Sequence, residues 1–185
     1  MRIGFVGTGT MGTPIASCLL AAGHRLTVYD ARPEAMGGLI GHGAATADSP
    51  SEAAYAAEVV FTSLPGPSEV EAAALDPNRG ILAGLRRGGT YIDLSTNAPA
   101  TIRRLAEAAR KREVAFLDAP VSGRPPDMTV MVGGRDARIS GIAGRCSRRS
   151  PRMFFMSVRV APAVPPSWSR NISAIPISSP QSRAC

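Results

Sequence analysis

The feature that most constrains the fold of this chain is a glycine-rich turn between a predicted strand and a predicted helix. Residues 2–7 (RIGFVG) are a short apolar run that ends in glycine, which is typical of a buried parallel strand. Residues 10–24 then carry apolar side chains at helical spacing, with Pro14 in the first turn and Gly23 as a stop. A strand that passes through glycines into a helix is the first half of a βαβ unit.

The turn itself has the pattern G-x-G-x-x-G and reads Gly7, Thr8, Gly9, Thr10, Met11, Gly12. We expect Gly7 to permit the tight turn, Gly9 to let the backbone approach a pyrophosphate, and Gly12 to let helix and strand pack closely. The following helix offers its first N–H groups and the positive end of its dipole to that anion. A flexible turn could hold the same glycines, but the position between strand and helix favours a dinucleotide site.

A second predicted strand, residues 25–30, ends in Asp30, eighteen residues after Gly12. A carboxylate at that place can accept hydrogen bonds from both ribose hydroxyls of NAD, and it would repel the 2′-phosphate of NADP. Arg32 could pair with that phosphate, or it could be a solvated surface charge. The sequence therefore favours NAD as the cofactor and leaves NADP open.

Strands and helices continue to alternate up to about residue 137. The further predicted strands are residues 59–64, 90–95, 114–120 and 128–134, and the further predicted helices are residues 33–43, 49–58, 67–75 and 96–113. Asn97 is expected to cap the last of these helices. This alternation predicts an α/β fold with a Rossmann-like, doubly wound, mainly parallel sheet, so we assign residues 1–137 to one NAD(P)-binding domain.

Residues 138–185 differ in composition from this domain. Up to residue 137 the chain has 13 Lys and Arg against 14 acids, whereas beyond it there are eight arginines and no acid. Because no groove-reading motif or interleaved aromatics accompany this charge, we expect no nucleic-acid partner. Neither a helical nor a strand period continues, so we predict a mostly disordered, irregular basic tail.

The cysteines and the apolar runs indicate the cellular compartment of such a chain. Cys18, Cys146 and Cys185 are scattered and fit neither a disulfide framework nor a metal site, which favours a reducing cytoplasm. No apolar run approaches the roughly 20 residues of a membrane helix. Glycines and Pro14 interrupt the apolar N-terminal stretch, unlike in a signal peptide. We expect a cytoplasmic protein without a membrane or metal partner.

Several motifs also occur in the order found in one enzyme family. They are residues 4–30, Leu64-Pro65, residues 93–99 (DLSTNAP), residues 116–123 (FLDAPVSG) and residues 130–134 (VMVGG). Together they resemble the β-hydroxyacid dehydrogenases, which include 3-hydroxyisobutyrate dehydrogenase and 2-hydroxy-3-oxopropionate reductase and are related to 6-phosphogluconate dehydrogenase. The resemblance implies hydride transfer between NAD(P) and a small β-hydroxyacid or the matching semialdehyde.

The resemblance also implies roles for single residues. Those of the cofactor site are Gly7, Thr8, Gly9, Thr10, Met11, Gly12, Asp30, Arg32, Leu64, Pro65 and Thr96. Leu64 and Pro65 would line the path from adenosine to nicotinamide, and Thr96 would contact the nicotinamide side. Ser122 and Gly123 would bind the substrate carboxylate, partly through backbone N–H groups. Each could singly be a strand end, a helix cap or a turn, but their order favours the family roles.

Two departures from the family pattern bear on activity. Residues 124–127 (RPPD) replace a longer loop with a second glycine, and two prolines stiffen them. The family's general acid/base is a lysine on a helix after the VGG strand. This chain has one lysine, Lys111, at the polar end of a predicted helix, where we expect a solvated surface charge. No catalytic residue is therefore predicted.

The family's helical second domain, through which its dimers form, is also absent from the pattern. We therefore expect the family's homo-oligomer interface to be lost and the turnover of this chain to be impaired. Three functions remain open: a residual dehydrogenase, a dinucleotide-binding module without turnover, and a non-functional gene remnant.

A shifted reading frame is our hypothesis for the tail. With suitable synonymous codons, a one-base shift turns residues 156–170 into a glycine-rich segment that contains a lysine. The same shift turns residues 138–155 into an amphipathic helix that leads into a strand. A frameshift near codon 137 would explain the lost acids, the surplus arginines and the lost periodicity together. A basic interaction tail is the alternative.

Overall fold

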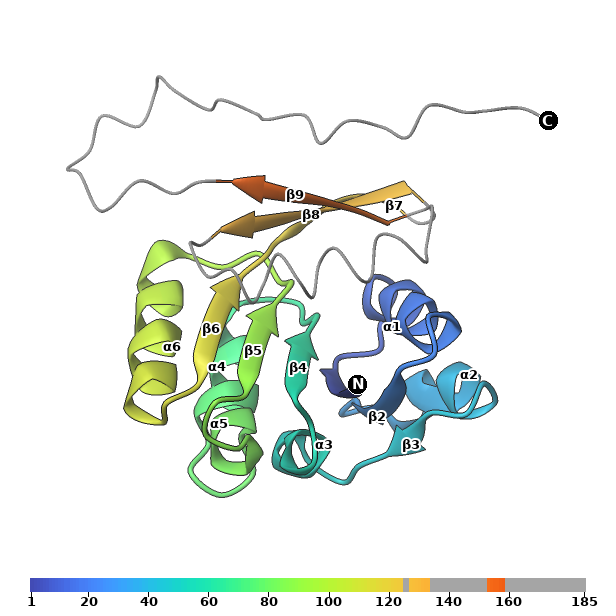
Figure 1. Cartoon of the computed structure of the whole chain (residues 1–185), viewed down its shortest axis with the longest axis horizontal. Helices are drawn as coiled ribbons and strands as arrows, with labels where there is room; N and C mark the ends of the chain where they lie inside the picture. The colour runs from blue at the N-terminus through green and yellow to red at the C-terminus, as the bar shows by residue number, and fades with distance from the viewer. Residues whose placement is uncertain (125–126, 134–152, 159–185) are drawn as a thin grey trace.

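The computed structural model describes residues 1–124, 127–133 and 153–158, and a sheet runs through them (Figure 1). Its strands are β1 (Arg2–Val6), β2 (Arg25–Tyr29), β3 (Ala45–Thr46), β4 (Val59–Thr62), β5 (Thr90–Asp93), β6 (Ala115–Asp118), β7 (Val121–Arg124), β8 (Asp127–Gly133) and β9 (Met153–Val158). The strand order is β3-β2-β1-β4-β5-β6-β8-β7, with β9 beside β8. Strands β1 to β6 pair in parallel, which confirms the predicted Rossmann-like, doubly wound sheet.

The helices lie within the predicted ranges, except for one short helix at residues 81–84 that the sequence did not predict. They are α1 (Gly12–Ala21), α2 (Gly37–Ile40) after a 3₁₀ turn (Pro33–Met36), α3 (Pro50–Tyr55), α4 (Pro67–Leu75), α5 (Ile81–Gly84) and α6 (Pro99–Lys111). Proline is the first residue of α3, α4 and α6, where its missing N–H costs no hydrogen bond. The hydroxyl of Ser49 caps α3 by accepting the N–H of Glu52 at 3.1 Å.

The prediction that Asn97 caps α6 is wrong. The N-cap residue is Ala98, and no side chain caps the helix. The amide of Asn97 instead donates to the carboxylate of Asp93 at the end of β5. Asn97 stands one residue before the N-cap position, and a charge-assisted hydrogen bond to Asp93 fixes its amide instead.

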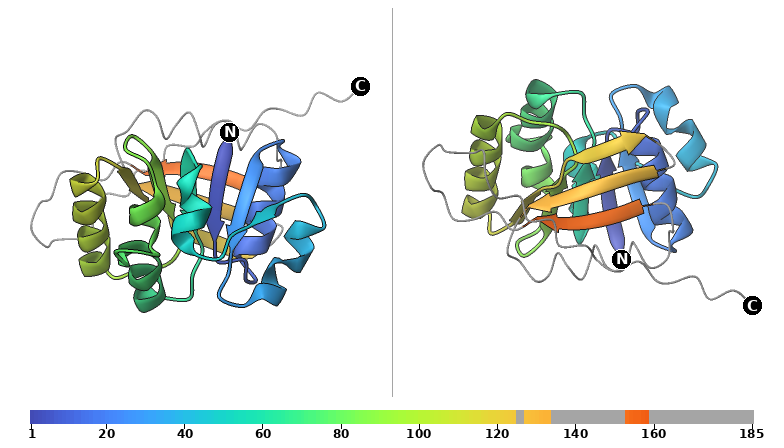
Figure 2. Two further views of the ribbon diagram at one scale, coloured as in Figure 1. Left: turned by 90° about the horizontal axis from the view of Figure 1, so that it is seen from below. Right: turned by 90° about the horizontal axis from the view of Figure 1, so that it is seen from above.

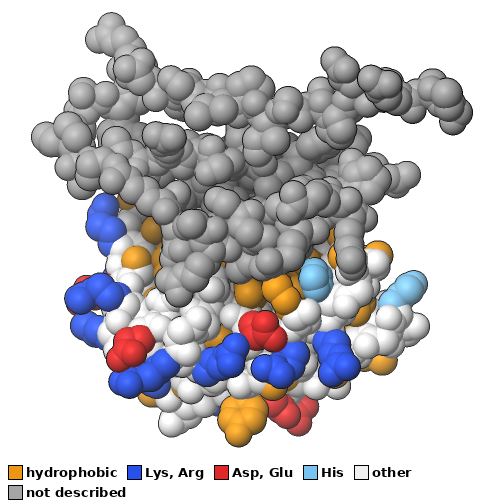
Figure 3. Space-filling model, in the orientation of Figure 1, with side chains coloured by type: hydrophobic (Ala, Val, Ile, Leu, Met, Phe, Trp, Pro, Cys, Tyr) orange, Lys and Arg blue, Asp and Glu red, His pale blue; other side chains and the backbone are white. Residues whose placement is uncertain are grey.

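The two faces of the sheet bury separate apolar cores. Residues of α1 and α2, such as Ile15, Leu19 and Leu39, pack with Phe5 and other side chains on one face. Helices α3 to α6 cover the other face through a second set of buried residues, which includes Ala53, Val70, Ile81, Leu105 and Tyr91. Neighbouring residues of one strand alternate between the cores, as the pleat requires. Figure 3 shows basic side chains with acidic ones among them around the lower rim of the described molecule.

Strands β7, β8 and β9 lie across the carboxyl ends of the parallel strands (Figure 2, right). Strands β7 and β8 pair antiparallel, β8 meets β6 antiparallel at Asp118 and Gly133, and β9 runs parallel to β8. The sequence predicts none of the strands β3, β7 and β9, and β9 falls in the predicted tail. The rest of residues 138–185 lies outside the described residues, together with Cys146 and Cys185.

Candidate functional site

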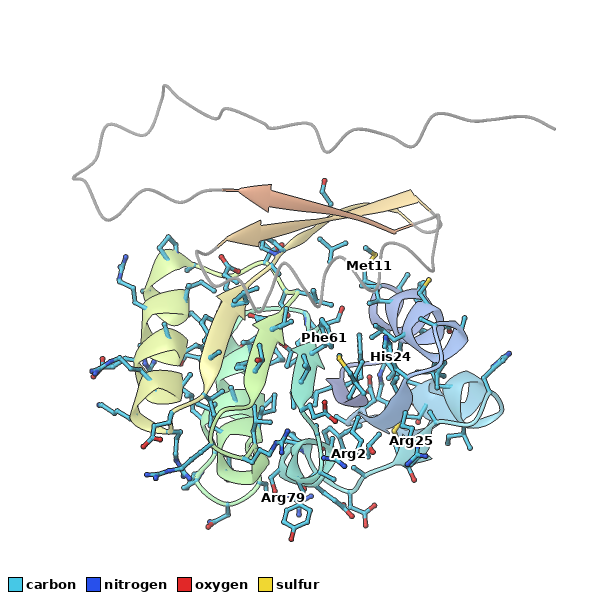
Figure 4. The ribbon with its side chains drawn as sticks, viewed as in Figure 1. Arg2, Met11, His24, Arg25, Phe61 and Arg79 are labelled. Carbon is cyan, nitrogen blue, oxygen red and sulfur yellow. The ribbon has the colours of Figure 1, made fainter. Side chains whose placement is uncertain are left out.

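One large cavity, of about 910 Å³, lies at the carboxyl ends of the parallel strands and continues along α4. Ligands of open α/β sheets bind at this edge, where the loops after adjacent strands diverge. The predicted cofactor residues that line it are Gly7, Gly9, Thr10, Met11, Asp30, Arg32, Leu64, Pro65 and Thr96. Met11 lies near the strand ends and Arg79 near the opposite edge of the molecule, and both contribute to the wall (Figure 4).

The glycines of the β1–α1 turn have three different environments. Gly7 has φ +94°, and a Cβ on it would lie 2.3 Å from the carbonyl oxygen of Ser63. A Cβ on Gly12 would lie 1.9 Å from the carbonyl oxygen of Gly7, so strand and helix touch there. A Cβ on Gly9 would meet only the Arg32 guanidinium, at 3.8 Å, and would project into the cavity. The space over Gly9 is therefore what a pyrophosphate would need.

The start of α1 supplies hydrogen-bond donors to this space. The N–H of Thr13 is bound to the carbonyl of Gly9 at 3.0 Å. Within the part of the chain that the structure describes, the N–H groups of Thr10 and Met11 have no acceptor. Such N–H groups, together with the helix dipole, favour a bound anion.

The carboxylate of Asp30 holds the glycine turn in place. Its Oδ2 accepts the backbone N–H of Thr8 at 2.7 Å and the Thr8 hydroxyl at 3.3 Å. Its Oδ1 accepts the N–H of Arg32 at 2.9 Å. Thr8 is buried and, like Gly12, is not part of the cavity wall. If two ribose hydroxyls bind here, they would donate to a carboxylate that already accepts hydrogen bonds from Thr8 and Arg32.

Arg32 lies over the turn at the mouth of the cavity. Its Nε is 3.7 Å from Asp30 Oδ1, and 67% of its side chain is exposed. Its guanidinium is also the group nearest to the open side of Gly9. A cation at this place can serve a phosphate of either cofactor, or remain paired with Asp30 in solvent.

The loops after β4 and β5 form the other end of the cavity. The N–H of Leu64 donates to Ser95 Oγ at 2.9 Å, and the N–H of Ser95 donates to Asp93 Oδ1 at 3.0 Å. Leu64, Pro65 and Thr96 line this end of the cavity, and Ser95 lines it as well. The sequence did not single out Ser95, although a small hydroxyl residue directly after a parallel strand is a signal for this edge.

Two carboxyl groups lie at the ends of β5 and β6: Asp93 is buried, and Asp118 is half-buried. Burial raises the pKa of Asp93, while hydrogen bonds from Thr62, Ser95 and Asn97 act in the opposite direction. Asp118 is its partner on the neighbouring strand β6. Burial, and then repulsion by Asp93, raise the pKa of Asp118 to about 6. The sequence assigned no role to either group, because only the strand register brings them together.

Ser122 and Gly123 lie in β7, where both are exposed, and neither is part of the cavity wall. The preceding residue, Val121, does line the cavity, and its N–H donates to the carbonyl of Leu94 at 3.3 Å. The predicted substrate residues thus adjoin the site.

Lys111 pairs with Glu107 at 2.9 Å on α6, and 68% of its side chain is exposed. This arrangement agrees with the predicted surface charge.

Residues of α4 were missed by the sequence prediction. Ala72 and Ala73 line the cavity with small side chains, together with Glu69 of the same helix and Asp76 directly after its end. The run of alanines in residues 72–74 was the available signal, since small residues leave room beside a helix. In the described ranges no group of three His, Cys, Asp or Glu side chains could hold a metal ion. None of the helices in those ranges has the length and apolar character needed to cross a bilayer.

Comparison with known proteins agrees with this geometry. Residues 2–144 match the family described as the NAD binding domain of 6-phosphogluconate dehydrogenase. A 3-hydroxyisobutyrate dehydrogenase of Pseudomonas aeruginosa is 44% identical over 137 residues, which are 71% of this chain and 46% of that protein. The chain spans about half the length of the curated relatives that it matches.

Solved structures show the same relationship. The 3-hydroxyisobutyrate dehydrogenase of Mycobacterium tuberculosis with L-serine has a TM-score of 0.74 and 30% identity over 84% of this chain and 54% of that chain. A structure of Psf3 in complex with NADP+ and 2-OPP has a TM-score of 0.74 and 29% identity over 84% of this chain and 56% of its own. This chain therefore belongs to the family described as the NAD binding domain of 6-phosphogluconate dehydrogenase.

Proposed function

We propose that this chain binds NAD(P) along its large cavity, with the pyrophosphate over Gly9. The observation that carries the proposal is the open backbone at Gly9 between two crowded glycines, directly before the first N–H groups of α1. Asp30 would hold the adenosine ribose. The nicotinamide would lie at the other end, beside Leu64, Pro65 and Thr96.

The dinucleotide supplies a ring that accepts or donates a hydride, and the chain supplies binding and orientation. Asp30 favours NAD, because its charge would oppose a 2′-phosphate. Arg32 leaves NADP possible, since its guanidinium is exposed and already faces the turn. We therefore propose NAD as the preferred cofactor and NADP as a weaker one.

The substrate class that fits best is a small β-hydroxyacid or the matching semialdehyde. The names of the relatives support this class, and Ser122 and Gly123 beside Val121 would offer a hydroxyl and an N–H group to a carboxylate. A dinucleotide-binding module without turnover is the second candidate. The position of Lys111 favours it, because the only lysine of the chain is paired with Glu107 on α6.

Two measurements test these functions. Calorimetric titration of the chain with NADH and NADPH tests binding, and the absence of heat with both would refute the proposal. Reduction of NAD+ with 3-hydroxyisobutyrate, and separately with L-serine, tests turnover. Loss of the proton-transfer group removes about 10²- to 10⁴-fold in rate, so we expect binding with little or no reduction.

We also propose that the NAD(P)-binding domain is formed by residues 1–137 and that residues 138–185 are read from a shifted frame. The composition supports this proposal, because beyond residue 137 the chain has eight arginines and no acid. Sequencing the coding DNA around codon 137 tests this, because the shifted frame must encode the lysine segment. Cytoplasmic residence and the lack of a nucleic-acid partner remain predictions from the cysteines and the charge distribution.

A further inference from the structure

The end of β5 carries a carboxylate that is completely buried beside the cavity. Asp93 Oδ1 accepts the hydroxyl of Thr62 at 2.7 Å and the N–H of Ser95 at 3.0 Å. Thr62 is the last residue of β4 and Asp93 is its partner in the parallel register. One oxygen atom therefore joins the ends of two adjacent strands at the level where their loops begin.

Ser95 extends this connection to the cavity wall. Its Oγ accepts the N–H of Leu64 at 2.9 Å, and its hydroxyl is among the groups that stabilise the charge of Asp93. The loop after β4 and the loop after β5 are thus tied by a buried hydroxyl. Leu64, Ser95 and Thr96 all face the cavity from these loops.

The side-chain amide of Asn97 is a third hydrogen-bond partner of this network, and its orientation leaves one polar atom unpaired. Its Nδ2 donates to Asp93 Oδ2, while its Oδ1 is buried and has no partner among the described residues. A buried acceptor without a donor is uncommon in native proteins. The acceptor character of Asp93 fixes the direction of this amide, so the network keeps its form at the expense of one hydrogen bond.

We propose that Asp93 is a positioning residue for the nicotinamide half of the dinucleotide, and that it acts through Ser95 on the two loops that hold Leu64 and Thr96. This inference rests on the proposed NAD(P) binding. The hydrogen bonds of Asp93 and Ser95 reach none of residues 7–12, and those of Asp30 reach neither Asp93 nor Ser95. The adenosine half should therefore bind independently of this network.

The test compares NADH with ADP-ribose, which has the adenosine and pyrophosphate groups but no nicotinamide. Ser95→Ala removes the acceptor of the Leu64 N–H and leaves that group unpaired. We expect the Kd for NADH to rise about 10-fold and the Kd for ADP-ribose to stay within about 2-fold. Both are measured by calorimetry on the full chain.

Thr101→Val is the matched control. It also removes one buried hydroxyl, which donates to Glu71 at 3.0 Å between α6 and α4 and lies outside the cavity wall. We expect it to leave both dissociation constants unchanged while it lowers the stability by a similar amount. An equal loss of affinity in this control would mean that general loosening explains the effect, and would overturn the inference.

Thr62→Val gives an independent approach to the same carboxylate with almost unchanged side-chain shape. If Thr62 and Ser95 act through Asp93, the double variant should lose less NADH affinity than the product of the two single losses. Independent, multiplied losses would overturn the role of Asp93. Equal weakening of NADH and ADP-ribose by Ser95→Ala would overturn it as well. A wild-type chain that binds neither ligand would instead overturn the proposed function, and this inference with it.

Discussion

The two ends of the cavity are built by different means. At the glycine end, the backbone itself forms the site, with Gly7 and Gly12 at positions that admit no side chain. At the opposite end, side-chain hydrogen bonds around Asp93 and Ser95 hold two loops together. The glycine end therefore requires residues without side chains within one short segment. The opposite end requires hydrogen bonds between residues that are about 30 positions apart in the sequence.

Gly12→Ala should break the glycine end most severely. Its Cβ would lie 1.9 Å from the carbonyl oxygen of Gly7, so α1 must move away from β1. We expect a loss of about 1–3 kcal/mol in the free energy of unfolding and a rise of roughly 100-fold or more in the Kd for NADH. Urea unfolding and calorimetry measure the two effects. Gly37→Ala is the control, because nothing lies within 4 Å of its Cβ position, and it should bind NADH normally.

Asp30→Asn should weaken the same end without a change of shape. Hydrogen bonds to a charged group contribute about 1.5–3 kcal/mol, so the Kd for NADH should rise roughly 10- to 100-fold. NADPH should lose less affinity, because the repulsion of its 2′-phosphate disappears as well. The ratio of the two dissociation constants is the measurement, and an unchanged ratio would contradict the assignment of Asp30 to the ribose.

Asp118, the strand neighbour of Asp93, should make the stability of the fold depend on pH. Its pKa lies at about 6 instead of 3.8, so between these values the folded chain holds a proton that the unfolded chain releases. Stability should therefore fall as the pH rises through this window and level off above it. Asp118→Asn should flatten the curve of unfolding free energy against pH.

Asp76→Asn provides a control of opposite sign for that curve. Hydrogen bonds from the N–H groups of Arg79 and Asn78 lower the pKa of Asp76. The stabilisation by ionised Asp76 is present above its ordinary pKa and is lost on acidification. The variant should therefore lose most of its unfolding free energy, relative to the wild type, above about pH 4. Identical pH curves for the Asp118 and Asp76 variants would contradict the opposite signs expected for the two carboxyl groups.

Lys111→Ala should have the smallest effect and belongs to neither end. Its exposed pair with Glu107 spans one turn of α6, and solvent screens such pairs strongly, so they contribute little. We expect NADH binding and any residual NAD+ reduction to stay unchanged. A large loss of reduction would give Lys111 the catalytic role that its position argues against.

The residues of the glycine end could be predicted from the sequence because their signals are local. The spacing of Gly7, Gly9 and Gly12 and the strand end at Asp30 each follow from a few adjacent residues. The Asp93 network could not be predicted in this way. It depends on the register that places Thr62, Asp93 and Asp118 side by side on three strands.

The errors at the sequence level have the same origin. Asparagine is a residue type that often caps helices, but the side chain of Asn97 donates to the carboxylate of Asp93 at the end of β5 instead. Strand β7 was missed because Val121 and Ser122 are followed by glycine and prolines, and only pairing with β8 makes the segment extended. The composition of the tail likewise did not predict β9, which needs β8 as its neighbour.

The bond between Thr8 and Asp30 has a consequence for how a nucleotide would arrive. Because the carboxylate already holds the turn, little conformational entropy remains to be lost on association. Capture should then be fast and close to rigid-body docking, and affinity should depend on how well ribose hydroxyls compete with a threonine for the same lone pairs.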